Sequence, residues 1–131
     1  MSPKVISTDH FSAKELQCKC GECEFEGMDL AFMERMELIR TDPQWSKPIR
    51  VSSAYRCENH NSKVSSTGAN GPHTTTRAMD CLVSGFDAVI LMMIAVKHGI
   101  TGVGVSQKGE HSSRFIHLDD LEENRPACWS Y

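Results

Sequence analysis

Two histidines and one aspartate in the second half of the chain are of the types that hold a catalytic metal ion. His73 follows a loop rich in Asn, Ser and Gly, Asp80 lies in the apolar segment that comes next, and His117 lies in the run RFIHLDD. A catalytic Zn²⁺ takes three protein ligands and leaves one position for a water molecule, whose pKa it lowers toward ~7. Two imidazoles and a carboxylate meet that requirement. The spacing alone is more often that of a solvated loop histidine and a turn aspartate.

The first half of the chain contains two segments with helical patterns. Residues 10–17 form a short helix in this interpretation, since Ser12 and Glu15 have the spacing of a capping box. Residues 29–40 predict an amphipathic helix that Thr41-Asp42-Pro43 ends. Its expected core stripe recurs at helical spacing and consists of Phe32, Met33, Met36 and Ile39.

The second half alternates strand patterns with one helix. Its segments are a strand over 49–55, a long loop over 57–72, a strand over 77–83, a helix over 85–98 that is apolar on most sides and expected to be buried, and two β-rich runs over 101–105 and 114–118 that read as a hairpin. Helices come first and strands gather later, so we expect an α+β fold with a mainly antiparallel sheet.

Length and composition favour one ordinary globular domain over 1–131. The chain has 40% apolar and 24% charged residues and a formal net charge of -3. A basic stripe is absent, so we expect no nucleic-acid partner. The longest apolar stretch is too short for a membrane helix and the N-terminus lacks an apolar signal region, so we expect no membrane partner and synthesis in the cytoplasm. We also expect a monomer.

Several short motifs surround the three residues in a fixed order along the chain. They are SAYR at 53–56, ENHN at 58–61, PHTTTRAMD at 72–80, GVGVS at 102–106 and HLD at 117–119. Together with the opening HFSAKELQCKCGEC, they resemble the zinc D-Ala-D-Ala carboxypeptidases and related peptidoglycan endopeptidases, including phage lysins. The resemblance covers nearly the whole chain and implies the fold that these peptidases share with the hedgehog signalling domain, with N-terminal helices packed on the sheet that carries the zinc site.

The resemblance also implies roles for individual residues. His73, Asp80 and His117 would be the zinc ligands, and Arg56 would bind or polarise the substrate carbonyl. A guanidinium is always charged and can stabilise a developing oxyanion, which fits that role. The alternative for Arg56 is a surface ion pair with a carboxylate such as Glu58. The implied partner is a peptidoglycan stem peptide, which the protein would reach after release or delivery from the cytoplasm.

The general base is where the sequence departs from the family. Several members have Glu or Asp three residues before the last ligand, and this chain has Arg114, which cannot accept a proton. We expect Asp119 to take that role or to orient an imidazole, because it lies on the same strand face as His117. Loop residue His111 is a second candidate and Glu110 a third.

The missing carboxylate leaves a second function open. The chain could be a non-catalytic module of the same fold, stabilised by zinc, that serves binding or structure, for example in a phage tail. Such a module would not need a base. A cytosolic enzyme that cleaves free D-Ala-D-Ala is a weaker third interpretation.

Cysteines form a separate candidate cluster near the N-terminus. Cys18, Cys20 and Cys23 could bind a structural zinc with Cys57 or His10 as the fourth ligand. C-x-C-x-x-C without a second tight pair is a weak pattern, and three reduced thiols in a loop explain it as well. Disulfides are the less favoured alternative for a chain without a secretory signal.

Three aromatic residues are candidate peptide or sugar contacts, although isolated aromatics in linkers and tails are more often packing. They are Trp45, Trp129 and Tyr131.

Overall fold

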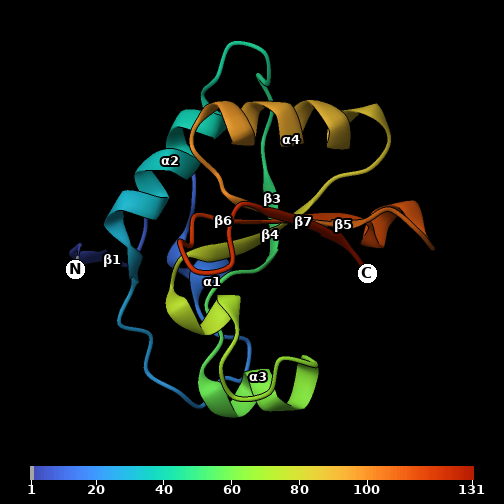
Figure 1. The fold of residues 1–131 in the computed structure, drawn as a ribbon. Helices are drawn as coiled ribbons and strands as arrows, with labels where there is room; N and C mark the ends of the chain where they lie inside the picture. The colour runs from blue at the N-terminus through green and yellow to red at the C-terminus, as the bar shows by residue number, and fades with distance from the viewer. Residues whose placement is uncertain (1) are drawn as a thin grey trace.

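A five-stranded sheet forms the centre of the fold (Figure 1). The computed structural model describes residues 2–131. The strands lie in the order β3-β4-β6-β5-β7, and all neighbours are antiparallel except β5 and β7. Their bounds are β3 Arg50–Ser53, β4 Ala78–Leu82, β5 Gly102–Ser106, β6 Phe115–Asp119 and β7 Ala127–Ser130. The expected α+β class, the mainly antiparallel sheet and the β5–β6 hairpin are confirmed.

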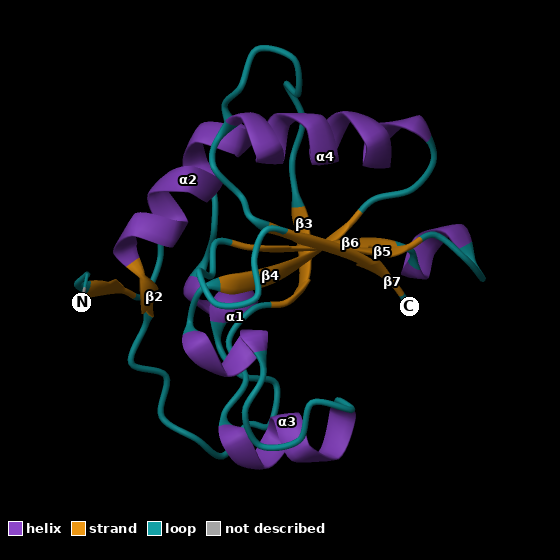
Figure 2. Cartoon of the chain, viewed as in Figure 1, coloured by secondary structure: helices purple, strands orange, loops and turns teal. Residues whose placement is uncertain are grey.

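Helices lie on both sides of this sheet (Figure 2). Helix α4 packs on β6 on one side, α1 packs on β3, and α3 lies on the side away from α4. The helices are α1 Ala13–Leu16, α2 Leu30–Arg40, α3 Glu58–Val64 and α4 Phe86–Lys97, with short 3₁₀ turns η1 at Pro72–Thr75 and η2 at His111–Ser113. A small second sheet pairs β1, Lys4–Val5, with β2, Met28–Asp29.

Side-chain caps start the first two helices. The Ser12 hydroxyl accepts from the Glu15 backbone N–H, and the Glu15 carboxylate accepts from the Ser12 N–H, which is the predicted capping box. Asp29 caps α2 by accepting from the Phe32 N–H at 3.0 Å. The predicted core stripe of α2 is fully buried and consists of Phe32, Met33, Met36 and Ile39.

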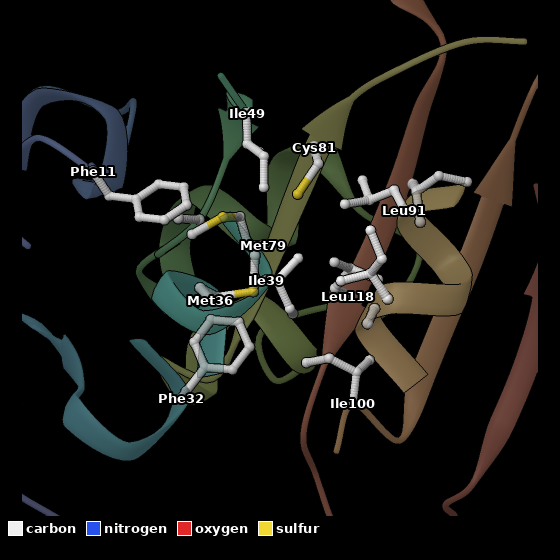
Figure 3. Packing of buried hydrophobic residues seen from close by; sticks show 14 of the residues in the cluster. Phe11, Phe32, Met36, Ile39, Ile49, Met79, Cys81, Leu91, Ile100 and Leu118 are labelled. Atoms are coloured by element: carbon white, nitrogen blue, oxygen red, sulfur yellow. The ribbon is translucent and has the colours of Figure 1, made fainter. Parts of the chain in front are cut away.

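Alternation along the central strands separates an apolar face from a polar one. Met79 and Cys81 of β4 and Ile116 and Leu118 of β6 are fully buried in the core between the sheet and the helices (Figure 3). Each large apolar side chain buried there contributes about 1.5–3 kcal/mol to stability. Since successive strand residues point to opposite faces, the residues between them face the other side. That second face carries the polar centre described below.

The segment 57–72 is not the loop that its Asn, Ser and Gly content predicted. Helix α3 occupies its first half, because the Cys57 thiol caps the N-terminus by accepting from the His60 N–H. Buried Asn61 then holds the helix to the turn after it, donating to Thr67 Oγ1 at 2.9 Å. Tertiary hydrogen bonds therefore override weak helix propensity in this segment.

Helix α4 packs against the sheet as expected, but its apolar outer face is exposed. Leu91 and Ala95 face the core, whereas Phe86 is 73% exposed and Met93 is 65% exposed. Within residues 2–131, neither α4 nor any other helix combines the length and apolar character needed to cross a bilayer.

Candidate metal centre

His73, Asp80 and His117 come together on the polar face of the sheet. Asp80 and His117 are direct Cα partners across β4 and β6, and His73 lies on η1, which packs against β4. All three side chains are buried. Asp80 Oδ1 lies 3.2 Å from His73 Nε2 and 3.1 Å from His117 Nδ1, and one ligand atom from each residue lies within 4.8 Å of the others.

The hydrogen bonds on the far side of each imidazole indicate whether the ring nitrogens that face Asp80 carry a proton or a lone pair. His73 Nδ1 lies 2.7 Å from the Ala54 carbonyl oxygen, and His117 Nε2 lies 2.8 Å from Asp119 Oδ2. Both outer nitrogens therefore donate, and in a neutral imidazole the inner nitrogen then carries a lone pair. In the neutral form of both imidazoles, two lone pairs therefore face the Asp80 carboxylate. Such a donor set fits a divalent cation that accepts nitrogen and oxygen ligands, as Zn²⁺ does.

The charges of the cluster are strongly coupled in the metal-free protein. Burial opposes ionisation of Asp80, yet hydrogen bonds from the His117 and His73 rings, in their protonated form, hold the pKa of this carboxyl well below its usual range. Burial likewise opposes the charging of His117, but hydrogen bonds to Asp119 and Asp80 raise its pKa. A proton on the imidazoles thus competes with a metal ion for the same lone pairs.

Asp119 lies behind His117 instead of beside the converging ligand atoms. Its side chain is fully buried and touches the outer nitrogen of His117. Arg125 binds both of its oxygens, at 2.9 and 2.8 Å, and these bonds overcome burial to lower the pKa of the Asp119 carboxyl. This position does not suit a base that takes a proton from water at the metal. It suits the other role considered for Asp119, a partner that orients the imidazole.

His111 is not part of the centre. It lies exposed on η2, in a shallow hollow formed with Arg50 and Leu82, and it does not line the pocket around the triad. Arg114, at the position of the family carboxylate, donates to the Gly109 carbonyl oxygen and stays at the surface. Glu110 is likewise exposed and absent from the pocket wall.

Arg56 lies at the wall of the pocket, with one guanidinium nitrogen 3.6 Å from Asp80 Oδ2. Its Nε donates to Ser53 Oγ and its Nη1 donates to Asn61 Oδ1, both at 3.1 Å. The guanidinium is thus held against the triad, and its carboxylate partner is Asp80 instead of Glu58. Ser53 and Asn61 together fix this orientation, and Asn61 comes from the helix that the sequence did not predict.

The triad opens into a pocket of about 820 Å³ whose far wall comes from the C-terminal strand. Strand β7 places Trp129 beside His117, with 5.2 Å between ring centroids, and Arg125 stacks on the indole at 5.0 Å. Gly104 permits this approach, because a Cβ there would lie 2.6 Å from the indole nitrogen. Tyr131 completes the wall.

These wall residues were largely missed at the level of sequence. In the sequence, Trp129 and Tyr131 are isolated aromatics of a kind more typical of packing than of binding, and no motif points to Arg125. Their spacing of two, which places both on one strand face, was the available indication. The third aromatic, Trp45, is buried in the core and has no part in the pocket.

Comparison with known proteins identifies the family of the chain. The sequence model of the family described as Peptidase M15 matches residues 9–119, which include all three residues of the triad and Arg56. No curated protein matches the chain. Strand β7, with Trp129 and Tyr131, falls outside the matched residues. With a match over most of its length, the chain belongs to the peptidase M15 family of zinc peptidases.

Proposed function

We propose that this protein is a zinc metallopeptidase that hydrolyses a peptide bond next to a D-amino acid in bacterial peptidoglycan. The observation that carries the proposal is the convergence of two imidazole lone pairs and one carboxylate at a peptide-sized pocket. Structural zinc sites are closed by four protein ligands, whereas catalytic sites use three and keep one position open. The triad offers three side chains, and all three also line the pocket.

His73, Asp80 and His117 are the residues that would hold the ion. A bound Zn²⁺ would supply Lewis acidity and lower the pKa of its water toward ~7. Asp119 and the Ala54 carbonyl hold the two imidazoles in the tautomers that leave the inner nitrogens unprotonated. Arg56 offers a permanent positive charge to the oxygen of the bond under attack.

The pocket wall also suits an anionic peptide. Arg56 and Arg125 bring positive charge to it, and Trp129 and Tyr131 offer flat surfaces on which a short peptide can pack. Stem peptides of bacterial wall end in carboxylates, so the positive charge of the wall favours them over a neutral sugar. A carboxypeptidase and an endopeptidase of the lysin type would differ in whether the bond cut is terminal or lies in a cross-link.

Digestion of purified peptidoglycan tests this proposal. Wild-type protein should release new peptide termini, detected by mass spectrometry, and should lose this activity on chelation and regain it with Zn²⁺. The variant His117→Ala should be inactive, whereas His111→Ala should retain activity because His111 lies outside the pocket. Wild-type protein that is loaded with zinc, folded and without activity on peptidoglycan or free dipeptides would refute the proposal.

One observation favours a second candidate, a zinc-dependent binding module without catalysis. Among residues 2–131, the only carboxylate that lines the pocket is Asp80, which is already committed to the ion. Arg114 stands at the position of the expected proton acceptor and donates to Gly109, and Asp119 contacts His117 from behind. Neither residue therefore supplies a proton acceptor at the pocket wall. This candidate predicts zinc-dependent retention on peptidoglycan with no release of fragments, which the same digestion experiment measures.

A further inference from the structure

Four cysteine thiols converge at a second place in the molecule, outside the triad. Cys18, Cys20 and Cys23 lie in the loop between α1 and β2, and Cys57 caps α3. Their sulfur atoms all lie within 4.8 Å of one another. The Cys57 Sγ lies 3.8 Å from that of Cys18 and 3.9 Å from that of Cys20.

We propose that these four thiols bind a structural Zn²⁺ as a closed tetrathiolate site. Zn–S bonds of ≈ 2.3 Å arranged tetrahedrally place the sulfurs about 3.8 Å apart. The distances from Cys57 Sγ to the sulfurs of Cys18 and Cys20 match this value. Four sulfurs and no open position are the ligand set of a structural zinc site.

Backbone N–H groups point at three of the sulfurs, as a thiolate requires. Cys20 Sγ accepts from the N–H groups of Glu22 and Cys23 at 3.3 and 3.4 Å. Cys18 Sγ accepts from the Cys57 N–H, and Cys57 Sγ accepts from the His60 N–H, both at 3.4 Å. Donors that converge on sulfur stabilise the deprotonated form, which is the form that binds metal.

The remaining candidates for the fourth ligand are excluded by position. The His10 ring nitrogen Nδ1 is bonded to Glu37 at 2.6 Å, so this histidine is used elsewhere. Cys81 is buried in the core of the sheet, and Cys128 is exposed on β7. Cys57 is distant in sequence from the other three, which explains why the sequence alone did not select it.

The site would fix the segment that carries Arg56. Arg56 precedes Cys57 directly, and its guanidinium is held by Asn61 one turn further into α3. A metal that ties Cys57 to the loop over 18–23 therefore anchors both ends of this contact. This consequence for activity rests on the proposed function, whereas the metal site itself does not.

Metal content separates the two sites. We expect about two zinc ions per chain in wild-type protein purified with reductant and without chelator, measured by mass spectrometry of the metal. The variants Cys57→Ser and His117→Ala should each retain about one, and the double variant about none. The control Cys128→Ser should retain both, because this exposed thiol lies outside the cluster.

A spectroscopic measurement covers the case in which Cys57→Ser does not fold. The His117→Ala protein, reconstituted with Co²⁺, should show the intense thiolate-to-metal charge-transfer and visible bands of a tetrahedral tetrathiolate. Zinc content unchanged in Cys57→Ser, no such bands in the cobalt protein, or disulfide-linked Cys18 and Cys57 in freshly isolated protein would each overturn the proposal. If wild-type protein binds two zinc ions but does not hydrolyse peptidoglycan, the proposed function is refuted and the proposal of this cysteine site stands.

Discussion

Replacing Asp119 by Asn tests whether this residue positions His117 or takes part in proton transfer. The substitution keeps an oxygen that can accept from His117 Nε2 but removes the charge that Arg125 binds at two points. Asp119 is fully buried and the Arg125 side chain is only 12% exposed, so the guanidinium left behind is largely removed from water. We therefore expect both weaker metal binding and lower stability.

The size of each effect follows from the burial. Breaking a buried ion pair by removing one partner costs about 3–5 kcal/mol, and the retained hydrogen bond places Asp119→Asn near about 3 kcal/mol. At about 2.1 cal/mol/K per residue, the 131 residues unfold with an entropy near 275 cal/mol/K, so Tm should fall by about 11 °C. Loss of an orienting partner should weaken zinc binding about 10- to 100-fold.

The assay is a zinc titration against a competing chelator, combined with hydrolysis at increasing zinc concentration. If Asp119 positions the imidazole, excess Zn²⁺ should restore activity at a temperature where the variant is folded. The matched control is Asp120→Asn, which removes a neighbouring buried carboxylate that is paired with Arg77 and Arg35 instead of with His117. This control should lose stability but keep its zinc affinity. Wild-type zinc affinity in Asp119→Asn together with a loss in kcat on the order of 100-fold or more would instead identify a general base and refute the reasoning.

Three further predictions follow from packing and charge. Leu118→Ala should lower the free energy of unfolding by about 2–5 kcal/mol in denaturant titrations, because the side chain is fully buried, whereas Leu38→Ala, at a residue 55% exposed, should change it by less than about 0.5 kcal/mol. Gly104→Ala should raise KM with zinc content unchanged, because its Cβ would displace Trp129; an unchanged KM would remove the indole from the binding site. The lowered pKa of Asp80 contributes stability that is complete above its unfolded value near about 4 and is lost as pH falls through the folded value. Metal-free protein should accordingly show a falling Tm from about pH 5 to pH 2, and a smaller slope in Asp80→Asn would confirm this source.

The strands that carry Asp80 and His117 were predictable because their patterns are local. RFIHLDD alternates apolar and polar residues, and this alternation alone separates His117 from the core residues Ile116 and Leu118 on either side. The cap at Ser12 and the stripe on α2 were predictable for the same reason.

The features that escaped prediction depend on contacts between distant residues. Helix α3 forms among poor helix formers because Cys57 and Asn61 anchor it by tertiary hydrogen bonds. A spacing of two placed Asp119 on the same face as His117, but only the fold shows that the carboxylate contacts Nε2 of the ring and is also bound by Arg125. Strand β7 pairs in parallel with β5, and such a pairing leaves no short-range pattern.

Because Asp80 and His117 are direct partners across β4 and β6, metal binding by both residues requires the correct register between these strands. A slip of one residue between β4 and β6 would turn the His117 ring into the apolar core and take it away from Asp80. A chain that refolds with the wrong alignment would therefore lack the proposed site, whereas a correctly aligned chain would gain the free energy of binding an ion there. An ion bound at the triad, as proposed, would thus favour the correct strand alignment, and in the variant Cys57→Ser metal retained after refolding would measure the fraction of chains that have aligned correctly.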